Sequence, residues 1–246
     1  MKWTLELSVL EVGHDAALFE PLNLHCEGGE ITAVLGSNGR GKTTLLRSIA
    51  GVLRPLGGKI SFSGGFGYVP QLFTPGFSYT ALDIVLMGRA RHINLFSQPS
   101  ENDVEIARQA MHGLDILDLA SRPFNTLSGG QRQMTLIARA LAVQSHLLLL
   151  DEPTGALDLR NQGAVLKLLK ELAKSVKMNI VFSTHEPNHA LLVADNTLLF
   201  LPDKKWLFGK TSAVLTEDNL SCAYGVKISR AHISGGGHTF APEFDF

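Results

Sequence analysis

The sequence lacks several features that would place a protein in a class at first sight. Its 246 residues include only two cysteines, Cys26 and Cys222, which lie far apart in the chain. This excludes a disulfide framework and a zinc knuckle, and it suits a reducing compartment. None of the nine histidines has the paired spacing of an HExxH motif, so we predict no metal site made of protein side chains.

A strong charge and a long apolar run are missing as well. The formal net charge is −1, so no strong field favours nucleic acid as a partner. No run of about 18 apolar residues could span a membrane. The N-terminal MKWTLELSVLEVG alternates instead of forming the apolar core of a signal peptide. Because 45% of the residues are apolar, we expect a soluble globular protein with a substantial core, which is compatible with membrane partners.

Two strand patterns predict an α/β fold. Residues 3–9 and 22–26 alternate apolar and polar side chains, which is typical of half-buried antiparallel strands. The runs ITAVLG from Ile31, SHLLLLDEP from Ser145 and NIVFSTH from Asn179 are nearly all apolar and are typical of central parallel strands. We therefore predict a parallel core with an antiparallel edge. On the first strand, the residues assigned to the buried face are Trp3, Leu5, Leu7 and Val9.

The middle of the chain predicts an inserted group of helices between Thr80 and Ala120. TALDIVLMGRA is expected to form one helix, and LDILDLA to start a third. Between them, Ser100 with Asp103 three residues later forms a capping pattern for a helix that runs to about His112 and ends at Gly113. The Pro and Gly residues in PQLFTPGFS suit a joint between this insert and the core.

These elements suggest how the chain is divided. The last two parallel strands are joined by a predicted amphipathic helix, whose apolar residues are Val165, Leu168, Leu169 and Leu172. The Gly-rich C-terminal ISGGGHTFAPEFDF has few core residues and is expected to lie on the surface or fray. The predicted parts are the core with its antiparallel edge at 1–74 and 131–215, a helical subdomain at 75–130, and a C-terminal helix and tail at 216–246.

The segment GSNGRGKT fits the phosphate-binding pattern G-x-x-x-x-G-K-[ST] at every fixed position. It follows an apolar strand and precedes a helix, which disfavours the alternative of a Gly-rich turn with a surface lysine. Its backbone N–H groups would surround phosphate oxygens, Lys42 would reach the β- and γ-phosphates, and the Thr43 hydroxyl would bind Mg²⁺. The predicted nucleotide-binding residues here are Gly36, Ser37, Asn38, Gly39, Arg40, Gly41, Lys42, Thr43 and Thr44.

The strand LLLLDEP places two carboxylates at its end. Asp151 is predicted to hold Mg²⁺ through water. In a strand the side chain of Glu152 would point away from that of Asp151, and we predict it as the general base for an attacking water. The alternative, that Asp-Glu-Pro merely ends a strand, is disfavoured by the phosphate loop upstream.

Four further pieces carry weight only in combination. Gln71 follows the apolar FGYVP, His185 ends NIVFSTH, GALD runs from Gly155 to Asp158, and LSGGQ runs from Leu127 to Gln131. Taken singly, they are ordinary features: a solvated glutamine, a structural histidine, a turn before a helix and a loop at a helix start.

Along the sequence these six motifs come in the order GSNGRGKT, Gln71, LSGGQ, LLLLDE, GALD and His185. In that order they resemble the motifs of the nucleotide-binding subunit of ABC transporters, and the resemblance covers about residues 1–225. The resemblance implies a P-loop NTPase (RecA-like) core that binds ATP with Mg²⁺ and hydrolyses ATP to power transport. It implies catalytic roles for Glu152, His185 and Gln71. Gln71 would also lie at the metal, together with Thr43 and Asp151.

The resemblance also explains why one chain has two phosphate-binding loops. In that family, two subunits close head to tail around two ATP molecules. Ser128, Gly129 and Gly130 would then touch the γ-phosphate held by the partner's Lys42, with Gln131 and Asp158 also at the shared nucleotide site. A helix that begins with small residues is a suitable anion site.

The implied partners are a second copy of the chain, permease subunits that dock in a groove between about Gln71 and Ile93, and, indirectly, a substrate-binding protein. The implied location is peripheral, on the cytoplasmic face of the cell (inner) membrane. LDIVLMGRARH and LTEDNLSCAYGV are similar to segments of metal-chelate importers for iron–siderophore, haem or cobalamin. A molybdate or tungstate branch fits DIVLMGRARHI about as well, so the substrate stays open.

Other ABC classes remain as alternatives. An exporter ATPase is disfavoured only by these weaker local matches. A non-transport ATPase that acts on the ribosome or nucleic acid is disfavoured because the chain has one nucleotide domain, a short insert without heptads and a net charge of −1.

The sequence departs from the family where an aromatic residue usually stacks on adenine. Residues 10–18 contain no Phe, Tyr or Trp. His14 is the nearest planar side chain, although it could equally be a solvated loop residue. Val12 offers only an apolar edge, and Phe19 is expected to enter the core.

Overall fold

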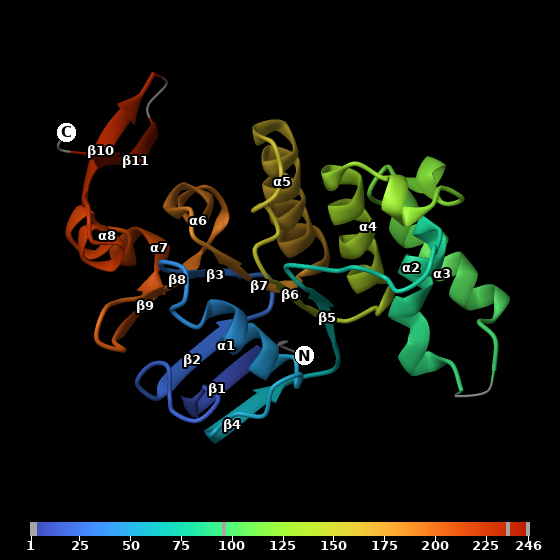
Figure 1. The fold of residues 1–246 in the computed structure, drawn as a ribbon, viewed down its shortest axis with the longest axis horizontal. Helices are drawn as coiled ribbons and strands as arrows, with labels where there is room; N and C mark the ends of the chain where they lie inside the picture. Colours follow the sequence, from blue (N-terminus) through green and yellow to red (C-terminus); the bar gives the residue numbers. More distant parts are fainter. Residues whose placement is uncertain (1–3, 95–96, 235–236, 245–246) are drawn as a thin grey trace.

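The computed structural model describes residues 4–94, 97–234 and 237–244, and a six-stranded sheet runs through its centre (Figure 1). Every residue of β3, β6, β7 and β8 is buried. Neighbouring strands are parallel except for the last pair, which confirms the predicted parallel core. In order across the sheet, the strands are β5 (Phe66–Val69), β6 (Leu147–Leu150), β7 (Asn179–Thr184), β3 (Ile31–Leu35), β8 (Asn196–Phe200) and β9 (Trp206–Lys210).

A second, antiparallel sheet forms the predicted edge. Helix α1 (Lys42–Ile49) lies between the two sheets, where Leu45 and Leu46 belong to the core that the sheets share (Figure 1). Because α1 follows β3 after a short loop, this packing fixes the start of α1 at the carboxyl edge of the parallel sheet. The strands of the second sheet are, in order, β2 (Leu22–Glu27), β1 (Thr4–Glu11) and β4 (Gly57–Phe62).

Strand β1 departs from the predicted alternation at a β-bulge. Leu5 and Leu7 are buried as predicted, but Val9 is 56% exposed and its φ is 48°. The register of β1 shifts here against both neighbouring strands. Gly58 on β4 provides the space, because a Cβ atom there would lie 2.2 Å from the Val9 carbonyl oxygen. Trp3, also assigned to the buried face, lies outside the described residues.

The opposite face of the large sheet is covered by α5 (Leu159–Val176) and α6 (Pro187–Val193). Helix α5 joins β6 to β7 and buries Val165 and Leu169, which confirms the predicted crossover helix. After β9 the chain forms α7 (Thr211–Val214) and the C-terminal helix α8 (Glu217–Tyr224) that the sequence indicated.

A group of helices follows β5, drawn in green at the right of Figure 1. Helices α2 (Ala81–Leu86), α3 (Glu101–His112) and α4 (Gly129–Ala142) pack against one another. The capping box of Ser100 and Asp103 is confirmed, as is the end of α3 at Gly113. In the part of the chain that the structure describes, no helix combines the length and apolar character needed to cross a membrane.

Two helices predicted in this group are shorter than expected. The helix predicted for TALDIVLMGRA changes after Leu86 into the 3₁₀ helix η1 (Met87–His92), and LDILDLA forms only the 3₁₀ turn η2 (Leu117–Leu119). Tertiary contacts account for the first change. Gly88 approaches α4 so closely that a Cβ would lie 2.1 Å from the Arg139 carbonyl oxygen. Arg89 is buried and donates to the main-chain oxygen of Ala142 at 2.9 Å.

The domain division stays a prediction, and α4 is the element that bears on it. The predicted boundary at residues 130 and 131 falls in the first turn of α4. The body of this helix packs against α2 and α3 and also against β5. Helix α4 therefore connects the inserted helices to the parallel sheet, instead of belonging to one part alone.

The C-terminal region is more ordered than predicted. Strands β10 (Lys227–Ile233) and β11 (Gly237–Glu243) form an antiparallel hairpin, and β11 falls within the segment that was expected to lie on the surface or fray. The hairpin packs on α6 and α8, and Phe240 is 5% exposed. Of the two expected outcomes, the described residues show a segment on the surface and not a frayed one, because Phe240 and the contacts with α6 hold the hairpin in place.

Candidate nucleotide-binding site

The predicted site residues follow four neighbouring parallel strands at their carboxyl ends. Gln71 follows β5, Asp151 and Glu152 follow β6, His185 follows β7, and the glycine-rich loop that starts at Gly36 follows β3. In open α/β sheets, ligands bind outside this edge. The parallel order thus gathers segments that are far apart in the sequence.

The glycine-rich loop has the backbone conformation that its glycines predict. Gly36, Gly39 and Gly41 have φ values of 148°, 80° and 96°, in the region that side chains disfavour. Helix α1 begins directly after Gly41, and no side chain caps its first N–H groups. These donors, together with the positive end of the helix dipole, make an anion site.

Lys42 lies inside this loop, with its side chain only 5% exposed. Its Nζ donates to the main-chain oxygens of Gly36 at 2.8 Å and Ser37 at 3.2 Å. It also lies 3.7 Å from Glu152 Oε1. Burial lowers the pKa of Lys42, and the nearby Glu152 carboxylate opposes this shift. An anionic ligand would be a stronger partner for the ammonium than neutral carbonyls are.

Asp151 has one satisfied and one unsatisfied carboxylate oxygen. Its Oδ1 accepts from Thr43 Oγ1 at 3.0 Å and from Ser183 Oγ at 2.7 Å. Its Oδ2 is buried and has no hydrogen-bond partner among the residues that the structure describes. Burial raises the pKa of Asp151, which the two hydroxyl bonds oppose. A buried carboxylate oxygen without a partner is costly, and a hard cation held by Asp151 and Thr43 would satisfy it.

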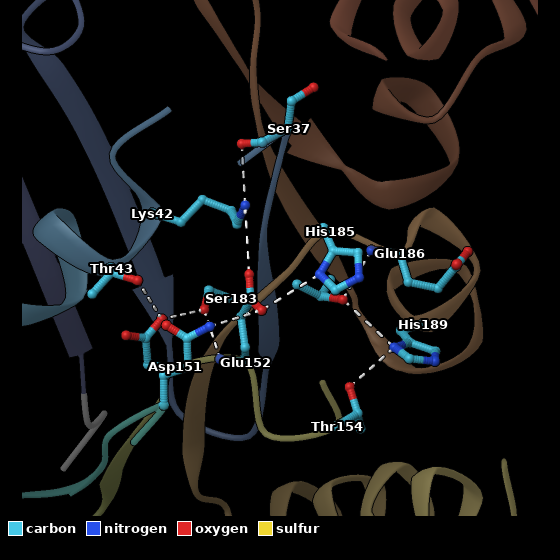
Figure 2. Close-up of polar contacts among 12 residues, drawn as sticks. Ser37, Lys42, Thr43, Asp151, Glu152, Thr154, Ser183, His185, Glu186 and His189 are labelled. Carbon is cyan, nitrogen blue, oxygen red and sulfur yellow. Dashed lines mark hydrogen bonds and ion pairs between the residues drawn. The ribbon is translucent and has the colours of Figure 1, made fainter. Parts of the chain in front are cut away.

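Glu152 lies at the centre of the polar contacts (Figure 2). Gln71 Nε2 donates to its Oε2 at 3.2 Å, and His185 Nδ1 lies 3.5 Å from the same oxygen. Strand β6 ends at Leu150 and Glu152 has a φ of 47°, so the predicted alternation of side chains within a strand does not apply here. The two carboxylates nevertheless have different partners: Glu152 contacts Lys42, Gln71 and His185.

A cavity of about 390 Å³ lies over the glycine-rich loop, which is within the usual range for small-ligand sites. It brings together predicted residues from four parts of the chain. The side chains and backbone that line it belong to His14, Leu18, Asn38, Gly39, Gly41, Lys42, Thr43, Thr44, Gln71 and Glu152.

The loop before β2 places His14 and Leu18 at this cavity. Phe19 is 1% exposed and stacks on Phe200 with ring centroids 4.7 Å apart, which confirms that it enters the core. Val12 is fully buried, so it offers no edge to a base, contrary to expectation. Leu18 provides the apolar surface instead, 36% exposed beside the cavity.

The signature residues lie elsewhere. Ser128 caps α4 in a reciprocal pair with Gln131: the Gln131 N–H donates to the Ser128 hydroxyl, and the Ser128 N–H donates to Gln131 Oε1. Asp158 caps α5 and accepts from the Asn161 N–H at 2.8 Å. Neither the signature loop nor Asp158 is among the described residues that line the cavity, and α4 and α1 lie in separate parts of the molecule (Figure 1). The structure therefore does not bring these predicted residues into the cavity over Lys42, although Gly129 lines a second cavity together with Gln71 and Glu152.

Sequence reasoning missed Ser183 and His189. Ser183 donates to Asp151 and accepts from the Glu152 N–H at 2.8 Å. The register of β6 with β7 pairs Leu150 with Phe182, so the next residues, Asp151 and Ser183, lie side by side. The signal in the sequence was a polar residue, Ser183, directly after the apolar residues of NIVFSTH. His189 Nδ1 lies 3.2 Å from Thr154 Oγ1, and burial lowers the pKa of His189.

Comparison with known proteins shows the family to which the chain is similar. The family model "ABC transporter" matches residues 19–155. The molybdate import ATP-binding protein MolC of Haemophilus influenzae is 50% identical over 207 residues, which cover 84% of this chain and 81% of that protein. A probable iron chelatin transport ATP-binding protein of Helicobacter pylori is 37% identical over 84% of this chain and 87% of its own length.

Two solved structures extend the comparison. A putative metal-chelate type ABC transporter in an inward-facing conformation has a chain with a TM-score of 0.93 and 44% identity, covering 99% of this chain and 98% of that chain. A bacterial ABC transporter cassette with a dimeric structure, MJ0796, has a TM-score of 0.67 and 26% identity, covering 79% and 93%. With the family match over residues 19–155, these likenesses establish that the chain belongs to the ABC transporter family, as an ATP-binding subunit that hydrolyses ATP.

Proposed function

We propose that this subunit powers an importer for a metal oxyanion such as molybdate or tungstate, or for a metal chelate such as an iron complex, haem or cobalamin. The relative with 50% identity is a molybdate import protein, and another with 37% identity is an iron chelatin transport protein. These relatives favour import over export and over a function at the ribosome or on nucleic acid. The substrate itself would be selected by other subunits, so both classes of cargo stay within the proposal.

The observation that carries the mechanism is the separation of the two phosphate-binding loops. The cavity with Lys42 contains Gln71 and Glu152 but none of the signature residues among the residues described. Ser128, Gly129 and Gly130 nevertheless start a helix, where N–H donors favour anions. We infer that a second copy supplies these residues, together with Gln131 and Asp158, so that two copies enclose two ATP molecules head to tail.

Within one half-site, the residues divide the work by their chemistry. The N–H groups of the loop from Gly36 to Thr44 and the Lys42 ammonium bind the phosphates. Thr43 and Asp151 would hold Mg²⁺, since Asp151 Oδ2 is buried with no partner among the described residues and Thr43 donates to Oδ1. Bound Mg²⁺ neutralises phosphate charge. Gln71 donates to Glu152 Oε2 at 3.2 Å, and we propose that it also lies at the metal, beside Thr43 and Asp151.

Glu152 is the proposed general base, which takes a proton from the attacking water on a carboxylate oxygen. Its Oε2 already accepts from Gln71 and faces His185 at 3.5 Å, so these two side chains orient it. Hydrolysis and phosphate release would then weaken the contact between the two copies.

The proposed permease contact lies on the helical group. A groove there is lined by Tyr79, Asp83, Leu86, Met87, Ala90, Ile93 and Pro99. All but Pro99 lie within the segment from Gln71 to Ile93, which we propose docks a helix of the membrane subunit. Such docking would hold the chain peripherally at the cytoplasmic face of the membrane. A binding protein would act on the chain only indirectly, through the permease.

The first test changes Glu152 to Gln, which keeps the shape and hydrogen bonding of the side chain but removes the proton acceptor. ATP should still bind and the closed dimer should accumulate, while turnover falls about 10²–10⁴-fold. Steady-state ATPase activity and sedimentation with ATP and Mg²⁺ measure both effects. Near-normal turnover of Glu152→Gln would remove Glu152 from the proposed role.

The second test concerns the shared site. Ser128→Arg places a bulky cation where the partner's nucleotide must fit, so turnover should be lost while nucleotide binding through Lys42 persists. Lys42→Ala should lose turnover through the other half of the site. Mixed in equal amounts, the two variants form dimers with one doubly defective and one intact site, and ATPase activity should partly return. ATP binding to Ser128→Arg as weak as to Lys42→Ala would contradict a site shared between copies.

The third test concerns the base. Stacking of a base on an aromatic side chain contributes about 1–3 kcal/mol, and the cavity offers only His14 and Leu18 for this contact. We expect poor discrimination between ATP and GTP, a modest loss of ATP affinity in His14→Ala, and tighter binding in His14→Tyr. Competition binding of ATP and GTP to the three proteins decides. A strong preference for ATP that His14→Ala leaves unchanged would show that another group holds the base.

A further inference from the structure

The last turn of α8 contacts two segments of the nucleotide site, the glycine-rich loop and the turn that carries His185. The hydroxyl of Ser37, in the glycine-rich loop, donates to the main-chain oxygen of Ala223 at 3.0 Å. The next residue, Tyr224, donates its hydroxyl to the main-chain oxygen of His185 at 2.9 Å. Two adjacent residues of one helix therefore connect the phosphate-binding loop to the turn that carries His185.

The C-terminal hairpin holds the same turn from its other end. The side-chain amide of Asn188 accepts from the Phe240 N–H at 2.8 Å and donates to the Phe240 carbonyl at 3.0 Å. The same amide nitrogen donates to Glu186 Oε1 at 3.1 Å. One side chain thus pairs with β11 as a neighbouring strand would, and it fixes residues 186–188, which directly follow His185.

Directional bonds, more than tight packing, set the position of this turn. A cavity of about 270 Å³ lies between the turn and the hairpin, with His185, Tyr224 and Phe240 in its wall. Burial, assisted by the nearby Glu186 carboxylate, raises the pKa of Tyr224 well above its ordinary value. The phenol therefore stays protonated and able to donate.

The imidazole of His185 depends on that position. Its side chain is 50% exposed, and its Nδ1 approaches Glu152 Oε2 at 3.5 Å. A contact of this length is weak by itself. The position of the His185 imidazole beside Glu152 therefore depends on where the main chain of residue 185 lies, and the Tyr224 hydroxyl bonds that main chain directly.

We infer that Tyr224 and Asn188 are positioning residues for hydrolysis: they hold the turn of residues 185–188 so that His185 faces Glu152. The inference rests on the proposed function, in which His185 and Glu152 act together. The C-terminal hairpin is then a support of the catalytic site, reached through α6, and its removal or displacement lowers turnover.

Single substitutions test the two supports. Tyr224→Phe keeps the ring and removes one hydroxyl, and Asn188→Leu keeps the volume and removes the amide. Loss of one hydrogen bond corresponds to about a 5-fold fall in kcat, and we expect a larger fall for Asn188→Leu, with the Kd for ATP unchanged in both. Ser229→Ala is the matched control, since Ser229 on β10 bonds Glu243 within the hairpin, away from the His185 turn. Thermal melting reports folding, and Tyr224→Phe alone suffices if Asn188→Leu does not fold.

A double substitution separates positioning from a structural role. His185→Ala removes the imidazole but keeps the main-chain oxygen that Tyr224 binds. If Tyr224 acts through the imidazole, adding Tyr224→Phe to His185→Ala causes no further fall in the rate constant of hydrolysis measured in single-turnover experiments. A further fall by the same factor as in the wild-type background, or an equal effect of Ser229→Ala, would overturn the inference.

The same set distinguishes this inference from the proposed function. Normal turnover of Tyr224→Phe and Asn188→Leu beside a defective His185→Ala would overturn the positioning role alone. Normal turnover of His185→Ala itself would overturn the role of His185 in the proposed function, and the positioning inference with it.

Discussion

The parallel pairing of β5, β6, β7 and β3, side by side in that order, is the constraint on which the rest of the site depends. Their carboxyl ends carry segments that begin near residues 36, 70, 151 and 185. The register of β6 with β7 pairs Leu150 with Phe182, so Asp151 comes within hydrogen-bonding distance of Ser183. A shift of one residue in this register would turn the polar residues away from the glycine-rich loop.

The charges at this edge are only partly balanced within the chain. Burial raises the pKa of Asp151 and lowers that of Lys42, so folding alone disfavours the charged form of both groups. Within the described part of the chain, Asp151 Oδ2 has no hydrogen-bond partner, and the Lys42 ammonium donates to carbonyl oxygens of its own loop. A phosphate chain with a cation would supply both missing partners, which supports the proposal that nucleotide and Mg²⁺ bind here together.

The sequence predicted the parts of the fold whose patterns are local. The glycine-rich loop, the Ser100 cap and the crossover helix with Val165 were all readable from spacing. The missed features depend on distant contacts. Val9 turns outward because Gly58 on another strand admits a bulge, and η1 forms where Gly88 meets α4.

The candidate site divides in the same way. Motif spacing predicted Lys42, Thr43, Asp151 and Glu152, because their chemistry requires fixed neighbours in the sequence. Identifying Ser183 required the register between β6 and β7. Identifying the support from Tyr224 required the path of the C-terminal segment through the structure. The hairpin had little pattern to detect, since few of its residues are buried, Ile228 and Phe240 among them.

Each chain provides half of a nucleotide site in this account, so the distance between halves on different copies is its most direct test. Asn38→Cys in one copy and Ser128→Cys in another, both with the exposed Cys222 changed to Ser, can be mixed and exposed to a short bifunctional thiol cross-linker. The account predicts a cross-link between copies that forms with ATP and the Glu152→Gln change and is lost with ADP. Cross-linking between copies that is equally strong without nucleotide, or none with ATP, would contradict the shared site.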